Sequence, residues 1–175
     1  MYDKFADRWF LSQFSDVGNQ IYIAISTTSD PLGSYYTYTF MSPDFPDYLK
    51  FSIWQDGYYM TSNQASDIVF VFERSQMILG NPSARALYST FTTGNTGGFF
   101  VPLPADAGDN FALPPAGTPL PFFAYYDNGW GGGTDGVKIW NATTDWTLGT
   151  MTITGPTQVN VSEFDATYSA SWYDV

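Results

Sequence analysis

The chain has 175 residues, of which 44% are hydrophobic and 19% aromatic, so it is long enough for one domain with a packed core and unlike a disordered segment. Six Lys and Arg face 17 Asp and Glu, and the net charge of -11 argues against nucleic acid or an anionic membrane as the partner. The absence of Cys and His excludes disulfides, thiolate chemistry, Ser-His-Asp catalysis and histidine-ligated zinc or iron sites. No apolar run approaches the ~20 residues of a membrane span, so we expect no membrane insertion.

In chain order, the N-terminal part of the sequence predicts short strands separated by turns. Residues 20–26 (QIYIAIS) alternate between apolar and other side chains, as a strand with one buried face does. Asp30-Pro31 interrupts the pattern before the next strand. The three strands expected here span residues 7–14, 20–26 and 34–40.

Residues 45–63 (FPDYLKFSIWQDGYYMTSN) predict a β-hairpin. The first strand places Phe51 and Ile53 on one face. Asp56-Gly57 predicts the turn, because Gly accepts a positive φ and Asp can bond the backbone ahead of it. An aromatic-rich strand follows the turn.

The remaining sequence predicts further strands around one helical turn. Residues 74–79 form that turn, and Gly80 and Pro82 end it. The Gly- and Pro-rich residues 94–120 are expected to be irregular chain. The strands expected in this part span residues 67–73, 87–93, 121–127, 135–140 and 150–154.

The strands recur in a unit of roughly 50 residues. Residues 7–12 align with 56–61 at an offset of 49, and residues 135–140 align with 67–72 at an offset of 68. Further aligned pairs are 21–26 with 68–73, 35–40 with 87–92, 121–127 with 58–63, and 150–154 with 87–91. Four-stranded units of this period are typical of β-propeller blades. A β-sandwich is the alternative, but it does not explain the aligned Asp-aromatic hairpins.

The expected fold is therefore all-β, with three to four propeller-like blades of four antiparallel strands in a single domain, 1–175. The approximate blades are 1–45, 46–95 and 96–160, with the start of another at 161–175. A closed propeller needs about four to eight blades, so the ring would be incomplete and its open sheet edges would favour self-association. The chain is a fragment, an oligomerising part-propeller or a shorter fold.

Several stretches resemble a family of large bacterial exported proteins with a β-propeller domain. They include YDKFADRWFLSQF, STTSDPLGSYYTYTF, the hairpin of residues 45–63, VFVFERSQMILG and GGGTDGVKIWNATTDWTLGTMTITGP. The resemblance covers nearly the whole chain. It implies a propeller, an extracellular or cell-surface location, a Met1 within or just before a blade, and a Val175 short of ring closure. It implies no activity or catalytic residues.

The loop of residues 127–136 (DNGWGGGTDG) is the candidate metal site. Asp127, Asn128 and Asp135 offer the hard oxygen ligands that calcium prefers, in a glycine-rich loop without an EF-hand pattern. The repeat supports a different interpretation, because Asp135 aligns with Asp67, where no such loop exists. An Asp that recurs at the start of one strand is typical of a turn or cap.

Exposed aromatic side chains are the candidate ligand-binding residues. Trp130 lies in the glycine loop without a strand to pack in, so it is the first candidate for stacking on a sugar ring, followed by Tyr125 and Tyr126. Tyr58 and Tyr59 are weaker candidates. Adjacent aromatic residues in a strand point to opposite faces, and the inward ring of each pair belongs to the core.

Carboxylate pairs are the candidate catalytic groups, because a glycosidase needs two of them roughly 5 to 9 Å apart. Asp44 with Asp47, and Asp106 with Asp109, are close in sequence on expected loops. Arg74 could clamp an acidic sugar, but an isolated Arg is more often paired with a neighbouring Asp.

Two functions remain open at this stage. The first is a non-catalytic binding or scaffold module of an exported protein, with a glycan or protein ligand. The second is a propeller-type glycoside hydrolase or lyase that uses Asp carboxylates. The lack of His and Cys and the Asp residues explained by the repeat favour the first.

Overall fold

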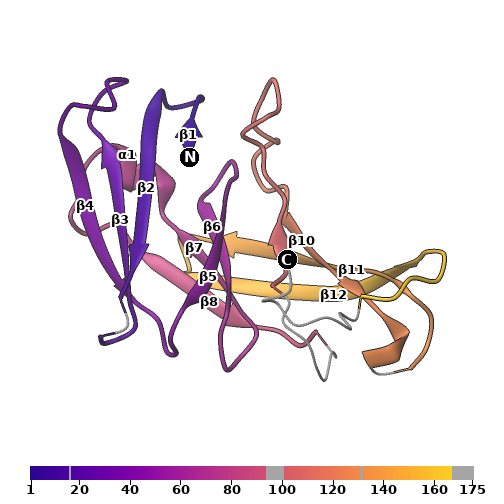
Figure 1. The fold of residues 1–175 in the computed structure, drawn as a ribbon. Coiled ribbons are helices and arrows are strands. Elements are labelled where there is room, and N and C mark those ends of the chain that lie inside the picture. The colour runs from indigo at the N-terminus through magenta and orange to yellow at the C-terminus, as the bar shows by residue number, and fades with distance from the viewer. Residues whose placement is uncertain (16, 94–100, 131, 167–175) are drawn as a thin grey trace.

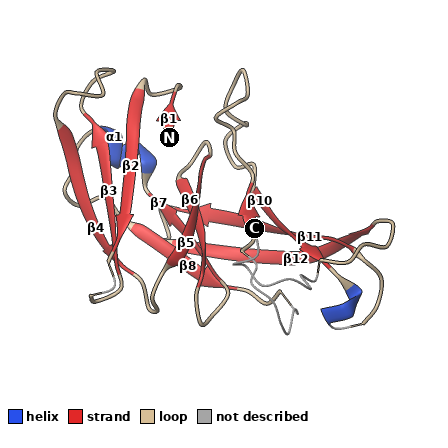
Figure 2. Ribbon diagram, viewed as in Figure 1, coloured by secondary structure: helices blue, strands red, loops and turns tan. Residues whose placement is uncertain are grey.

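The computed structural model describes residues 1–15, 17–93, 101–130 and 132–166. The strands form three four-stranded antiparallel sheets, in an arrangement that is open rather than closed (Figures 1 and 2). Within each sheet, strands that are neighbours in sequence are hydrogen-bonded neighbours in space. The prediction of an all-β fold with four-stranded antiparallel units is confirmed.

The bounds of the strands define the three sheets. Sheet 1 contains β1 (Tyr2–Asp3), β2 (Arg8–Phe14), β3 (Gln20–Ser26) and β4 (Tyr35–Met41). Sheet 2 contains β5 (Asp47–Ile53), β6 (Tyr58–Asn63), β7 (Ile68–Phe72) and β8 (Ala86–Thr90). Sheet 3 contains β9 (Leu103–Pro104), β10 (Leu120–Tyr126), β11 (Gly136–Asp145) and β12 (Thr150–Asn160). The helical turns are α1 (Arg74–Ile78) and η1 (Asn128–Trp130).

Two strands were not predicted from the sequence, namely β1 and β9. Each has only two residues, which is too short for an alternating pattern to be recognised. Strand β9 lies in the stretch expected to be irregular, of which residues 94–100 are outside the described residues. The first strand of sheet 1 and that of sheet 3 are therefore defined by pairing with their neighbours alone.

The hairpin of β5 and β6 forms as predicted, although the turn is built differently. Phe51 and Ile53 pair with Met60 and Tyr58, so they share the predicted face. Gly57 does not have a positive φ. A Cβ at this position would lie 2.3 Å from Cγ2 of Val71, so the close approach of β7 is what requires glycine.

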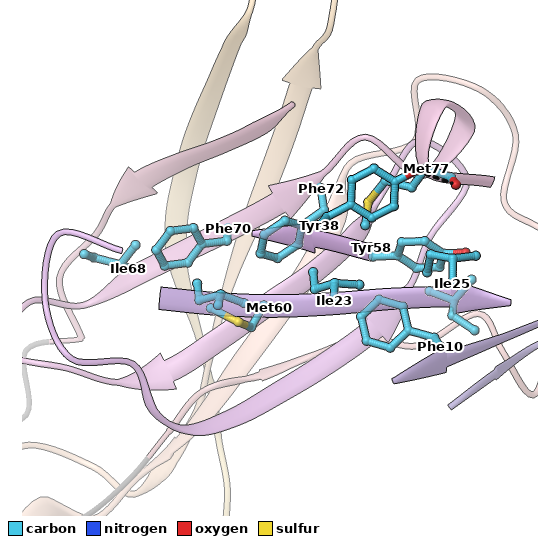
Figure 3. Close-up of a cluster of buried hydrophobic side chains, with 12 residues drawn as sticks. Phe10, Ile23, Ile25, Tyr38, Tyr58, Met60, Ile68, Phe70, Phe72 and Met77 are labelled. Carbon is cyan, nitrogen blue, oxygen red and sulfur yellow. Dashed lines mark hydrogen bonds between the residues drawn. The ribbon is translucent and has the colours of Figure 1, made fainter. Parts of the chain in front are cut away.

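Two hydrophobic clusters place sheet 2 between the other sheets. In the first, Phe10, Ile23 and Ile25 of sheet 1 pack against residues of sheet 2 (Figure 3). The sheet 2 members of this cluster are Ile53, Tyr58, Met60, Ile68, Phe70 and Phe72. The second cluster packs the opposite face of sheet 2 against sheet 3, and it contains Trp54, Tyr59, Val69, Val71, Leu120, Phe122 and Trp140.

A buried ion pair joins sheet 1 to sheet 2. Arg74 Nε lies 2.6 Å from Oδ2 of Asp3, and its Nη2 donates to Oδ1 at 3.0 Å. The Tyr58 hydroxyl donates to the same carboxylate at 2.8 Å, and burial raises the pKa of Tyr58. The Asp3 carboxylate also accepts the N–H groups of Phe5 and Ala6. The interpretation of Arg74 as the partner of an Asp is confirmed.

Helix α1 covers one end of the first cluster and forms close to the predicted residues. Gly80 follows it at φ +71°, and the Gly80 N–H donates to the Met77 carbonyl. The Tyr38 hydroxyl of sheet 1 donates to that same carbonyl at 2.9 Å. The helix is therefore held to sheet 1 as well as to its own sheet.

The segments aligned from the sequence occupy equivalent strands in the three sheets. Strands β2, β6 and β10 are second strands, and β3, β7 and β11 are third strands. Three of the sequence alignments are out of register with the observed ladders: 21–26 with 68–73 and 35–40 with 87–92 by one residue each, and 150–154 with 87–91 by seven residues. Phe10 aligns with Tyr59, and their cross-strand partners are Ile25 and Val71, whereas the sequence alignment placed Ile25 on Phe72. A shift of one residue reverses the face of every side chain, so the ladder decides the alignment.

Candidate functional site

The first strands of sheets 1 and 2 and the connection after β9 border one hollow of about 500 Å³. Tyr2 of β1 and Ile53 of β5 line it, together with Lys4, Asp106 and Asp109. The two acids belong to the connection after β9, so the structure brings this predicted carboxylate pair into one concave site beside a lysine. The remaining lining residues are Met1 and Gly108.

Asp106 has a structural contact within this hollow. Its Oδ1 accepts the Ile53 N–H at 2.8 Å and the Gly108 N–H at 3.0 Å. The carboxylate therefore fixes the end of β5 to the connection between β9 and β10. Asp109 and Lys4 are exposed. The other predicted carboxylate pair, Asp44 and Asp47, lines neither of the two hollows described here.

In the predicted metal loop, the aspartates bind the backbone. Asp127 accepts the N–H groups of Gly129 and Ala166, one at each oxygen, both at 2.8 Å. Asp135 accepts the N–H groups of Asn128 and Phe164 in the same way, at 2.8 and 2.6 Å.

Both carboxylates of this loop are buried, and together they hold the loop and the chain after β12 onto the end of sheet 3. Among the described residues, no group of three acidic side chains is placed to hold a metal ion. Calcium binding by Asp127, Asn128 and Asp135 stays a prediction from the sequence.

The predicted aromatic residues have different environments. Tyr125 is exposed on sheet 3, and its ring meets the edge of Phe164 at 6.0 Å between centroids. Tyr126 is buried and donates its hydroxyl to the Gly132 carbonyl at 2.7 Å. The backbone of Trp130 is part of η1, whereas its side chain lies outside the described residues.

Lys138 approaches the buried ring of Tyr126 from β11. Its Nζ lies 3.7 Å from the ring centroid and donates to the Thr93 carbonyl at 2.9 Å. Burial lowers the pKa of Lys138. These contacts make Tyr126 part of the packing between sheets 2 and 3 and leave Tyr125 as the accessible ring of the pair.

The outer face of sheet 1, which points away from sheet 2, is uncharged and was not singled out from the sequence. Its centre is a row of Leu11, Ala24 and Thr37, and the next row contains Gln13, Tyr22 and Thr39. These residues line a shallow hollow of about 340 Å³, which also touches Ser12, Ile23 and Tyr38. The small side chain of Ala24 lies between larger neighbours and forms the depression.

The outer face of sheet 3, which points away from sheet 2, has no charged side chain in its two central rows and is more apolar than that of sheet 1. Leu103, Phe123 and Ile139 form one row, and Tyr125, Val137 and Val159 form the next. Phe123 is 38% exposed, although its chain neighbour Phe122 is completely buried. Phe164 covers the end of this face beside Tyr125. Alternation along β10 was the sequence signal for this face, but the sequence did not show that no other sheet in the described part of the chain covers it.

Comparisons with known proteins add no relative. No protein-family model matches the sequence, and no curated protein or solved structure is significantly similar to it. The resemblance to exported propeller proteins therefore rests on the sequence motifs alone. Within the described parts of the chain, no helix is long and apolar enough to cross a membrane.

Proposed function

We propose that the chain is a non-catalytic binding or scaffold module of an exported or cell-surface protein. The supporting observation is that the central rows of the outer faces of sheets 1 and 3 carry no charge, in a chain with 17 acidic residues. Contiguous exposed apolar and aromatic side chains mark binding surfaces in soluble proteins. The buried aspartates, by contrast, bind backbone N–H groups and support the fold.

The hollow on sheet 1 gives this proposal a specific surface. Tyr22 offers an exposed ring, and Gln13, Thr37 and Thr39 offer uncharged hydrogen-bonding groups beside it. A protein surface or an uncharged glycan matches this chemistry. An acidic sugar does not, because none of the hollow's lining residues is cationic.

The test measures binding and cleavage together. The chain is mixed with insoluble cellulose and chitin and with soluble polygalacturonate, and both retention and release of reducing ends are measured. We expect no release of reducing ends, and any retention on the neutral polymers should fall in Tyr22→Ala but not in Phe111→Ala, whose ring is fully exposed on a loop. Release of reducing ends from any of the three polymers would contradict a non-catalytic module.

The second candidate function is a glycoside hydrolase or lyase. The shared hollow of Asp106, Asp109 and Lys4 favours it, because two carboxylates and a cation in one concave site are suited to an acid-base reaction on a sugar. Asp109→Asn would then abolish the release of reducing ends, whereas Glu163→Gln, an exposed acid outside this hollow, would retain it. Equal rates in the two variants would reject these catalysts.

A further inference from the structure

Sheet 2 shows how one sheet of this fold uses its two faces. Tyr58 and Met60 belong to the cluster shared with sheet 1, whereas Tyr59, between them in β6, belongs to the cluster shared with sheet 3. One face of the sheet therefore packs against the preceding sheet and the other against the following sheet. All three side chains are fully buried.

Sheet 1 has the same two kinds of face. The offset of 49 places Phe10 on Tyr59, and Phe10 also packs against the following sheet. The same offset aligns Leu11 with Met60, whose side chain packs against the preceding sheet. Among the described residues, no other sheet packs against the Leu11 face of sheet 1, and Leu11 is 53% exposed where Met60 is fully buried. The outer face of sheet 1 thus corresponds to the face of sheet 2 that packs against the preceding sheet, but no described sheet packs against it.

Sheet 3 has the opposite face uncovered. The offset of 68 aligns Phe72 with Trp140. The cross-strand partner of Phe72 is Tyr58 and that of Trp140 is Phe122, so these two partners correspond. The residues that follow them, Tyr59 and Phe123, therefore also correspond. Phe122 packs against sheet 2, as expected for a face toward the preceding sheet. Phe123 occupies the position that Phe10 and Tyr59 use to cover a following sheet. The outer face of sheet 3 therefore corresponds to the face of sheet 2 that packs against the following sheet, but no described sheet packs against it.

We propose that a second copy of this chain docks head-to-tail, with the outer face of its sheet 1 on the outer face of sheet 3. The proposal rests on the proposed function, because it names the protein partner of the same two surfaces. The contact would continue the packing that already joins sheet 1 to sheet 2 and sheet 2 to sheet 3. It involves faces of sheets, not the open sheet edges that the sequence suggested.

The chemistry of the two faces fits this contact. Leu11, Tyr22 and Ala24 on one side would meet Phe123 and Ile139 on the other, and burying them removes no charge from water. A contact between two different faces is heterologous, so it forms a ring when its rotation closes. Two copies of three sheets would supply six, which is within the range of about four to eight blades found in closed propellers.

The net charge predicts how this association responds to salt. Two chains of charge -11 repel one another, and the repulsion is screened over about 10 Å at 0.1 M ionic strength. The uncharged central rows of the two faces contribute no ion pairs that salt would weaken. We therefore expect stronger association at 0.5 M than at 0.05 M NaCl.

The first experiment is sedimentation velocity across a range of concentrations. The parent should reach about twice the 19.5 kDa chain mass, and Leu11→Glu and Phe123→Glu should each weaken association at least about tenfold, because each buries a carboxylate against an apolar face. Leu32→Glu and Phe111→Glu are the matched controls on exposed loops and should associate like the parent. Thr37→Glu, in the row of Leu11, replaces Leu11→Glu if that variant does not fold.

Mixing the two variants tests the direction of the contact. Leu11→Glu retains an intact sheet 3 face, and Phe123→Glu retains an intact sheet 1 face. An equimolar mixture should therefore form a one-to-one heterodimer that neither variant forms alone. Face-to-face pairing of two identical surfaces would not be restored in this way.

Two outcomes would overturn the proposal. One is a parent that stays monomeric at all concentrations and salt levels. The other is a dimer that both Glu variants retain. A monomeric chain that still binds polysaccharide without cleaving it would refute the docking proposal and leave the proposed function standing. Release of reducing ends would refute the proposed function, whatever the oligomeric state.

Discussion

Sheets 1 and 2 have the same four-stranded meander but differ in how many of their faces are covered. Every residue of β7 is buried, and β6 is buried from Tyr58 to Ser62. Strands β2 and β3 of sheet 1 instead mix buried with exposed side chains, and Leu11 is exposed where Phe10 is 2% exposed. Burial in this molecule is therefore set by the place of a sheet in the stack, and not by its topology.

The comparison also explains why the sequence signal differs between the two sheets. Strand β3 alternates because only one of its faces is buried, and it was predicted with its observed bounds. Strand β7 reads as a continuous apolar run because both faces are buried. Such a run carries no information on which side chain faces which way, and the alignment of residues 21–26 with 68–73 was wrong by one residue.

The largest expected effect separates a residue of the middle sheet from one on an open face. Phe72→Ala should lower the free energy of unfolding by about 3–5 kcal/mol, because it empties a site packed between sheets 1 and 2. Phe123→Ala should cost about 1 kcal/mol or less, since its ring is partly in water already. Urea unfolding of the monomer measures both, and equal costs would mean that the outer face of sheet 3 is covered in solution.

The second effect concerns the ion pair that joins the two sheets. Arg74→Met should cost about 3–5 kcal/mol, because it leaves the buried Asp3 carboxylate without its cation. The control is Arg85→Met, next to β8, whose side chain pairs with Glu73 and is 44% exposed, so this change should lower the urea midpoint much less than Arg74→Met does. Similar urea midpoints for the two variants would contradict a role for Asp3 and Arg74 in holding the sheets together.

The pair of Arg85 and Glu73 also has a pH dependence. Hydrogen bonds from Arg85 lower the pKa of Glu73 in the folded state. Its stabilisation is thus present above the ordinary pKa of a glutamate and is lost as the pH falls through the lowered value. The small difference between the parent and Arg85→Met should disappear over this acidic window, as measured by thermal unfolding.

The pH dependence of stability should have the opposite sign for Asp56, which lies at the contact between sheets 2 and 3. Burial raises its pKa, and its carboxylate accepts the Tyr59 hydroxyl, which also meets Thr144 of β11. The folded state then binds the proton more tightly, so the parent loses stability as the pH rises from the ordinary to the raised pKa. Asp56→Asn should lack this loss and lie within about 1 kcal/mol of the parent at neutral pH. Parallel pH profiles of the two proteins would contradict the raised pKa.

The smallest expected effect is that of calcium. The sequence interpretation of Asp127 and Asp135 predicts a higher melting temperature with Ca²⁺ than with a chelator. Calcium at a hundredfold excess over its dissociation constant would add about 2.7 kcal/mol to the free energy of unfolding. The backbone bonds to all four carboxylate oxygens favour no shift. Trp fluorescence during a thermal melt distinguishes the two, and a shift that Asp135→Asn removes would establish the metal site.

The sequence by itself determined the longer strands and their order along the chain. Alternation in β3 and the Gly80 helix end are local patterns, so the residues concerned specify them without help from the rest of the chain. The pairing of Asp106 with Asp109 as neighbouring acids was also visible. Their meeting with Lys4 in one hollow was not, because that contact joins segments about a hundred residues apart.

Only the tertiary structure decided which faces are covered and what the acids bind. Asp127 and Asp135 have the composition of a cation site, but the chain after β12 returns and supplies N–H groups to them. From the sequence, Leu11 and Phe123 look like ordinary strand residues. Both are exposed in the structure, because they lie on the outer faces of sheets 1 and 3. Side-chain period is a local property, whereas the presence of a neighbouring sheet depends on packing between distant segments.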